Sequence, residues 1–281
     1  MKNKSSRRRV LFALVLLLLV LMLLVELLRE KIMTSFDYGE LVYVICSRII
    51  GGVSCTALLL LLSFEKMLSP KTSLRAFLIF IPCMAVAVNN FPFITYFTGR
   101  AHVDSGAAHV LLYAFSCVCT AFFEEMAFRG CVFTSILQVK GSRRSDVFWS
   151  IALSSAVFGL VHLVNLFVGA SPISVILQVG YSFLIGAMCS VILVRTVNIW
   201  YCVLLHAVYN FAGGVVPECG GGQLWDTPTV VLTTIIALLV TAYVIYLLVK
   251  TERVDVERFL NKKMTPAGDN GQVDGGNDAD V

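Results

Sequence analysis

The sequence has few charges for its length. Charged residues make up only 14% of the 281 residues, whereas hydrophobic residues make up 58%. Soluble domains have about 25% charged and about 45–50% apolar residues. The core of a soluble fold cannot absorb this excess of apolar side chains. The composition therefore excludes an ordinary soluble domain and indicates a protein embedded in a lipid bilayer.

Two further features are absent. The formal net charge is only +4, and the basic residues lie at the ends of apolar runs instead of forming an interleaved basic face. This pattern argues against nucleic acid as a partner. The nine cysteines do not form the pattern of a disulfide framework, because all but Cys219 fall inside apolar runs. We expect them to pack as small side chains.

What the sequence does contain is long apolar runs. Eight segments have the length and hydropathy of a membrane-spanning helix, which needs about 20 predominantly apolar residues. The predicted fold class is therefore all-α, a polytopic membrane helix bundle with about eight transmembrane helices. The predicted spans are residues 10–28, 41–64, 74–93, 107–139, 147–168, 173–194, 199–216 and 229–249.

The first span has two interpretations. Three arginines at residues 7–9 precede its apolar run, as they do in a cleaved signal peptide. The run is long for a signal peptide, however, and no cleavage site of the small-x-small type follows it. We interpret this segment as an uncleaved membrane anchor.

The lysines and arginines between the spans predict the orientation. With the N-terminus inside, 17 loop cations lie on the cytoplasmic side and 3 on the outer side, which is a strong positive-inside bias. We therefore expect an integral plasma-membrane protein with both termini in the cytoplasm. The outer cations are Arg29, Lys31 and Arg100.

The chain shows no internal repeat and no second globular domain. Its last stretch, residues 265–281, lacks aromatic residues and is rich in Gly, Asn and Asp, which predicts a solvated, disordered tail. The predicted organisation is a basic cytoplasmic N-terminus (1–9), three membrane helices (10–104), a membrane core with the polar motifs (105–216), an outer loop with the last helix (217–250) and a cytoplasmic tail (251–281).

Three charges lie inside the fourth span, within the stretch AFFEEMAFRG. A charge at the middle of a bilayer costs about 2.5–3.5 kcal/mol on insertion scales, so each needs a reason. Glu125 and Arg129 are four residues apart and can pair on one helix face. Glu124 lies about 100° around the helix and has no cation one turn away. The simplest alternative is a structural ion pair with a stray carboxylate.

Two later spans also contain polar side chains. Phe158 and His162 lie one turn apart in FGLVH, and His206 and Asn210 lie one turn apart in HAVYN. Counting helix rise from the inner loops gives Glu124 a depth of about 24 Å and His162 about 27 Å, but His206 only about 16 Å. These depths permit one shared site without requiring it.

The three motifs together resemble those of a known family. EEMAFR matches EExxxR, FGLVH matches FxxxH and HAVYN matches HxxxN, in that order and on separate spans. The chain thus resembles the CPBP (CAAX protease and bacteriocin-processing, or Abi) family of intramembrane proteases over roughly residues 105–215. The resemblance implies an intramembrane peptidase that acts on a membrane-associated protein or peptide and leaves open whether that substrate is prenylated.

Peptide hydrolysis needs an activated water, a stabilised oxyanion and a proton for the leaving amine. With the resemblance, Glu124 is the candidate general base, and His162 is placed to hold the same water and to pass on a proton. No serine or cysteine stands beside a histidine in a comparable arrangement, so we expect no covalent nucleophile.

The remaining motif residues have supporting roles in this interpretation. His206 and Asn210, which share one helix face, are candidate hydrogen-bond donors to the oxyanion. The pair Glu125 and Arg129 is expected to orient the residues that touch the substrate.

A metal mechanism stays open beside this one. Glu124, His162 and His206 also form a possible zinc set, with water in the fourth position. The motif HExxH is absent, so these ligands come from three helices. We favour water activation by the glutamate without a metal cofactor and keep Zn²⁺ as the alternative.

Two other classes of function remain. A transporter uses intramembrane charges along an ion path, but it favours broken helices in two matching halves, and the only proline deep in a span is Pro82. A non-catalytic relative, such as a bacteriocin self-immunity or scaffold protein, would carry the same fold without turnover.

The predicted topology can be tested with reporter fusions. A reporter after Val281 should report the cytoplasm, and a reporter within residues 217–226 should report the exterior, because eight spans place both termini on one side. A C-terminal reporter that responds as exterior would contradict this layout.

Overall fold

The computed structural model describes residues 2–32 and 38–260. Side chains are described at residue 10 and over 13–27 and 38–260. The long helices are α1 (Lys2–Ile32), α2 (Gly39–Leu61), α3 (Leu74–Asn89), α5 (Ala107–Glu125), α7 (Arg144–Val161), α8 (Pro172–Thr196), α9 (Trp200–Cys219) and α10 (Thr227–Val249). The short elements are η1 (Glu65–Leu68), α4 (Phe93–Phe97), β1 (Ala101–Val103), η2 (Met126–Phe133), α6 (Thr134–Lys140), η3 (His162–Leu166), β2 (Gly220–Gly222) and α11 (Arg253–Phe259).

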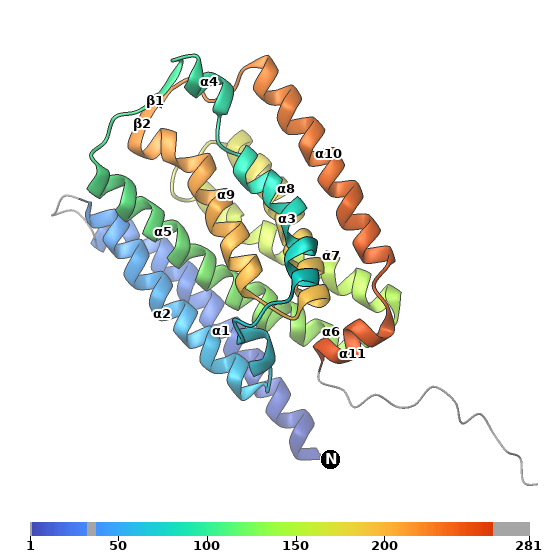
Figure 1. The fold of residues 1–281 in the computed structure, drawn as a ribbon. Coiled ribbons are helices and arrows are strands. Elements are labelled where there is room, and N and C mark those ends of the chain that lie inside the picture. The colour runs from blue at the N-terminus through green and yellow to red at the C-terminus, as the bar shows by residue number, and fades with distance from the viewer. Residues whose placement is uncertain (1, 33–37, 261–281) are drawn as a thin grey trace, which may run out of the picture.

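The helices form one bundle (Figure 1). Helices α1, α2 and α5 lie side by side on one flank, α9 runs through the middle, and α3, α8 and α10 lie beyond it. Among the described residues, six helices are long and apolar enough to cross a membrane: Gly39–Leu61, Ala107–Lys140, Arg144–Leu166, Pro172–Thr196, Trp200–Cys219 and Thr227–Val249. The predicted α-helical membrane bundle is confirmed. The predicted number of eight spans is not, because Ala13–Leu27 and Leu74–Asn89 are shorter apolar helices.

The outer face of the bundle suits a lipid environment. Leu238 and Leu239 of α10 are 66% and 67% exposed, and neighbouring exposed positions on this helix are also apolar. Exposed apolar area of this extent is unfavourable in water but not among lipid tails. The core is also mostly apolar, but it encloses a small set of buried polar residues that includes Glu125, Arg129 and His206.

Glycines allow α2 to approach α5 closely. A Cβ atom at Gly52 would lie 2.4 Å from the ring of Phe122, and one at Gly51 would lie 2.7 Å from the ring of Phe123. Small residues at a membrane helix interface permit such close approach. The contact fixes α5 from the side opposite α9, just before the Glu124–Glu125 pair.

Two three-residue strands add to the predicted all-α fold at one end of the bundle. Strand β1 pairs antiparallel with β2, with Ala101 opposite Gly222 and Val103 opposite Gly220. The β2 backbone approaches so closely that a Cβ atom at Gly220 would lie 2.0 Å from the carbonyl oxygen of His102. Only glycine fits at this position.

An ion pair lies beside these strands. Arg100 contacts Asp226 at 2.5 Å, and Asp226 caps α10 by accepting a hydrogen bond from the Thr229 amide at 2.9 Å. Hydrogen bonds from Thr229, and then the positive charge of Arg100, hold the pKa of Asp226 below its usual range. The loop before α10 is thereby fixed to the strand end.

The prediction of a disordered tail over 251–281 is wrong for its first part. Residues 253–259 form α11, whose Phe259 is buried against Phe64 and Phe133. Asp255 forms an ion pair with Arg195 at 2.5 Å and closes a capping box with Glu252. Residues 261–281 and the side chains of residues 1–9 lie outside the part of the chain that the structure describes.

The cysteines behave as the sequence predicts. All nine are free thiols, and eight of them are buried, Cys46 being the exposed one. Cys219, the one cysteine outside the predicted spans, is buried at the end of α9. They pack as small side chains, and the fold depends on no disulfide.

Candidate active site

The predicted ion pair lies at the centre of the bundle. Arg129 Nη1 is 3.0 Å from Glu125 Oε1, and the two side chains are 1% and 0% exposed. This confirms the pairing that the spacing of four residues predicts. The two charges are fully removed from lipid and water, so each depends on the other for stabilisation.

A change of helix type follows directly after Glu125. The predicted continuous helix over 107–139 contains a π-helical segment, η2, whose eight side chains are all buried. A π-helix widens the turn and typically occurs at functional sites. Directly after this segment, the hydroxyl of Thr134 donates to the carbonyl of Gly130. The wider turns carry Arg129 and set the direction in which its side chain leaves the helix.

Arg129 is held by a ring as well as by a charge. Its guanidinium carbon lies 4.2 Å from the centroid of the Phe158 ring, a cation–π contact. Neither of its terminal nitrogens makes a hydrogen bond. The contact with Glu125 is therefore an ion pair whose geometry is not that of a hydrogen bond. Gly186 makes room for it, since a Cβ atom there would lie 2.9 Å from Arg129 Nη2.

His206 lies between the two glutamates. Its Nδ1 is 2.7 Å from Glu125 Oε1, and its Nε2 is 3.5 Å from Glu124 Oε2. Because a carboxylate is an acceptor, Nδ1 carries the hydrogen in this arrangement. Glu125 therefore contacts both Arg129 and His206 through one oxygen atom. The histidine that the sequence assigns to the oxyanion is positioned by Glu125.

His162 and Glu124 line one cavity of about 540 Å³. His162 is the first residue of the short helix η3, so α7 ends earlier than the predicted span over 147–168. The Phe158 ring lies edge-on to both histidines, with centroids 5.3 Å from His162 and 5.8 Å from His206. The Phe158 ring thus contacts both imidazoles.

The side chain of Asn210 makes no hydrogen bond or ion pair with the other motif residues that the structure describes. Its backbone carbonyl accepts a hydrogen bond from Tyr113 at 3.3 Å, whereas its side chain makes no hydrogen bond to the described residues. It lies one turn beyond His206 on α9. Its predicted role at the oxyanion stays a prediction.

The shallow depth that the sequence gives for His206 has a structural cause. The connection from α8 to α9 is buried, with Asn198 4% and Ile199 0% exposed. Trp200, the first residue of α9, stacks on Phe122 with centroids 6.1 Å apart. Helix α9 therefore begins at the depth of Phe122, and counting from the preceding loop underestimates the depth of His206.

Sequence reasoning missed two charged residues at this cavity. Glu26 of α1 and Arg48 of α2 form an ion pair at 2.6 Å and line the same cavity as Glu124. Arg48 is a single arginine inside an apolar span, so the rule that selects Glu124 also selects it. The amides of Asn165 and Gln178 line the cavity too and hydrogen-bond to each other at 2.7 Å.

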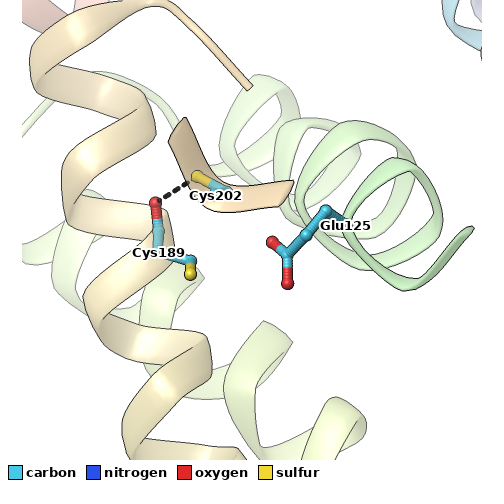
Figure 2. Close-up of side chains that lie close together, drawn as sticks. All are labelled: Glu125, Cys189 and Cys202. Atoms are coloured by element: carbon cyan, nitrogen blue, oxygen red, sulfur yellow. Dashed lines mark hydrogen bonds between the residues drawn. The ribbon is translucent and has the colours of Figure 1, made fainter. Parts of the chain in front are cut away.

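One group of side chains has the spacing of metal ligands. Among the described residues, the ligand atoms of Glu125, Cys189 and Cys202 lie within 4.8 Å of one another. Figure 2 shows the Glu125 carboxylate facing the two cysteines, with the Cys202 thiol donating to the Cys189 carbonyl at 3.2 Å. Sequence spacing gives no signal for this group, because its members come from three helices.

The predicted zinc set does not meet the same criterion. Glu124, His162 and His206 are not all within 4.8 Å of one another at their ligand atoms. Zinc ligands at about 2.0–2.2 Å from one ion must lie closer than this. The three side chains as they lie do not fit the ion.

The fold and this site together define a class of protein. A bundle of apolar helices encloses two glutamates, an arginine and two histidines, and one of the glutamates and one of the histidines reach a cavity. Charged residues inside a membrane are costly and mark functional sites. The chain is a multi-pass membrane protein with a polar site inside its bundle.

Comparison with known families agrees with the motifs. Residues 106–212 match the model of the family described as type II CAAX prenyl endopeptidase Rce1-like. This segment contains every predicted site residue, and the match confirms the resemblance to the CPBP family of intramembrane proteases. Neither a curated protein nor a solved structure gave a match to the chain.

The two adjacent glutamates should differ in their contribution to stability. Glu125→Gln leaves Arg129 unpaired in a buried setting, which costs about 3–5 kcal/mol. We expect a clear loss of folded protein and a lower thermal unfolding midpoint in detergent. Glu124→Gln is the matched control and should unfold near the wild-type temperature. Equal midpoints for both variants would contradict the importance of the Glu125–Arg129 pair.

Proposed function

We propose that the chain is an intramembrane endopeptidase of the CAAX-protease type, which hydrolyses a peptide bond of a membrane-associated protein or peptide with a water activated by Glu124. One observation carries this proposal. Of the two adjacent glutamates, Glu125 is bound to Arg129, whereas Glu124 is 14% exposed and lines the cavity together with His162.

The proposed reaction proceeds without a covalent intermediate. The Glu124 carboxylate takes a proton from water, and the water oxygen forms a bond to the carbonyl carbon of the substrate. The tetrahedral intermediate then loses the amine as the carbon–nitrogen bond breaks, and the amine takes up a proton. His162, in the same cavity wall, holds the attacking water and passes on this proton.

His206 and Asn210 are proposed to stabilise the oxyanion. The contact of Glu125 with Nδ1 fixes the orientation of the imidazole, so its Nε2 is directed toward Glu124. In the protonated form both ring nitrogens donate, one to Glu125 and the other toward the reacting group. Fixed donors in a site of low dielectric are effective because they need no reorganisation during the reaction.

The arrangement favours a hydrolase over a transporter. The charged and imidazole groups on α5, η2, η3 and α9 belong to one cluster in the matched segment, together with the Phe158 ring of α7. An ion path in a transporter is more typically built from two matching halves with broken helices. A non-catalytic immunity or scaffold relative is separated from the proposed enzyme by the turnover experiment below.

Glu124→Gln should abolish turnover while the protein stays folded. A positioned general base contributes about 10²–10⁴-fold to the rate, and glutamine is a neutral side chain of the same shape. The measurement is cleavage of a farnesylated peptide with a CAAX C-terminus by the full chain in detergent or proteoliposomes. A variant that is folded and as active as the wild type would contradict the role of Glu124. Absence of turnover by the wild type would favour the non-catalytic relative.

The metal question has its own measurement. If Glu124 activates water alone, the active, detergent-purified enzyme should contain well under one zinc per chain by elemental analysis. His162→Ala and His206→Ala should then lose activity without a change in metal content. A full equivalent of zinc in the wild type that both variants lose would establish the zinc mechanism instead, because removing one ligand depletes the ion.

A further inference from the structure

Glu125 has one carboxylate oxygen that the cluster around it does not use. Its Oε1 contacts Arg129 at 3.0 Å and His206 at 2.7 Å. Its Oε2 is buried and has no hydrogen-bond partner among the described residues. A buried carboxylate oxygen without a partner is costly, because it has lost its hydration and gained no replacement. This oxygen is therefore a candidate ligand atom for a group that the protein binds.

Two thiols lie where such a group would bind. The carboxylate of Glu125 faces Cys189 of α8 and Cys202 of α9 (Figure 2), and the ligand atoms of the three side chains lie within 4.8 Å of one another. All three side chains are buried. Two zinc–sulfur bonds of about 2.3 Å each can join sulfur atoms that are at most about 4.6 Å apart. A small inward movement of the side chains would therefore close the group around one ion.

The donor set selects the class of ion. Thiolates are soft ligands that suit Zn²⁺ and softer ions such as Cd²⁺, whereas Mg²⁺ and Ca²⁺ take oxygen ligands. A site inside an apolar bundle also limits the charge that it can accept, because an uncompensated buried charge is costly. A divalent cation that displaces one proton from each of the two thiols leaves the net charge of the group unchanged. A thiophilic divalent cation therefore satisfies both the donor chemistry and the charge balance.

We propose that Glu125, Cys189 and Cys202 bind a thiophilic divalent cation, and that the bound cation lowers the activity of the enzyme. Binding replaces two sulfur–hydrogen bonds by two metal–sulfur bonds, releases two protons and adds one metal–oxygen bond from the carboxylate. The site differs from the zinc set considered for catalysis, because it contains neither Glu124 nor a histidine. The binding of the cation does not depend on the proposed function, whereas the loss of activity rests on it.

The effect on activity follows from the contacts of Glu125. Its carboxylate stabilises the buried charge of Arg129 and orients the imidazole of His206. A bound cation is the largest local charge in its site, and a carboxylate that coordinates it has less negative charge for its other partners. We expect the cation to weaken both contacts and so to move the imidazole from its position beside Glu124.

The cavity gives the cation a route to the buried site. Glu124 lines the cavity, and its Oε2 is 3.5 Å from Nε2 of His206, whose Nδ1 contacts Glu125. A carboxylate, an imidazole and a second carboxylate thus lead from the cavity toward the thiols. Because Cys189 and Cys202 are both 0% exposed, we expect the cation to load slowly.

The chain offers a matched pair of thiols as a control. Cys55 and Cys131 are also buried, and the Cys131 thiol donates to the Cys55 carbonyl at 3.6 Å, as the Cys202 thiol does to the Cys189 carbonyl at 3.2 Å. Among the residues that the structure describes, this second pair belongs to no group of three possible ligands. Its replacement removes the same number of thiols and leaves the proposed site intact.

The experiment measures cation binding apart from turnover. The full chain, purified in detergent with its thiols reduced, is incubated with Cd²⁺ until the ultraviolet absorbance of cadmium–thiolate bonds is constant, and is then desalted and analysed for cadmium. Cys189→Ala with Cys202→Ala should retain about one cadmium per chain less than the wild type, because removing ligands depletes the ion. Cys55→Ala with Cys131→Ala should retain as much cadmium as the wild type.

The thermal unfolding midpoint separates loss of the site from loss of the fold. Cd²⁺ should raise the midpoint of the wild type, because a ligand that binds only the folded state stabilises it. It should not raise the midpoint of the Cys189 and Cys202 double variant. Cys202→Ser, which keeps a hydrogen-bond donor for the Cys189 carbonyl, is the milder second variant and should also lose the bound cadmium.

Turnover of a farnesylated CAAX peptide is measured on the same samples. Without cadmium, both double variants should turn over as the wild type does. Bound cadmium should lower the turnover of the wild type and of the Cys55 and Cys131 variant by about tenfold or more, in the range seen when the partners of a site's ligands are lost. The turnover of the Cys189 and Cys202 variant should not fall.

Each part of the proposal has its own contrary result. Equal retention of cadmium by the wild type and the folded Cys189 and Cys202 variants would overturn the site. Cadmium held at these thiols with full turnover would overturn the inhibition. A wild-type chain without turnover in the absence of cadmium would reject the proposed function and the inhibition with it, while the retention of cadmium would still decide whether the site exists.

Discussion

The site depends on one constraint, the burial of the Arg129 charge inside an apolar bundle. The side chain is 1% exposed and a guanidinium stays protonated in proteins, so the surrounding groups must stabilise the charge. Glu125 supplies the opposite charge, Phe158 supplies a ring face, and Gly186 leaves the space that the guanidinium occupies. The π-helical turns of η2 carry Arg129 to this position. These contacts join α5, η2, α7 and α8 around one charge.

This constraint also separates the roles of adjacent glutamates. Glu125 uses one oxygen to contact both Arg129 and His206, so it links the buried charge to the imidazole. Glu124 is rotated about 100° around the helix and cannot share that face. It reaches the cavity wall instead, with an exposed fraction of 14% against 0% for Glu125. Two adjacent glutamates therefore have different environments, and only Glu124 is exposed to the cavity.

The sequence predicted the local parts of this arrangement, because local parts depend on spacing. The Glu125–Arg129 pair and the packing of Phe158 beside His162 follow from a separation of one helical turn. The contact of Glu125 with His206 joins residues 81 apart, and no spacing rule reaches that far. The π-helix is likewise invisible to a hydropathy pattern. The helix α11 was missed because its short apolar face, with Phe259, was counted as part of a polar tail.

The sequence analysis did not select Arg48, although a charge inside an apolar span is as costly there as it is at Glu124. Its position in α2 lies outside the matched segment, yet its side chain faces the same cavity as the proposed base. Helix α1 contributes apolar side chains to that wall as well, among them Leu19 and Met22. The residues proposed to carry the chemistry therefore lie in 106–212, while part of the cavity wall comes from the N-terminal helices α1 and α2. A family can keep one reaction and change its substrates by changing such a wall, since the catalytic groups need not move.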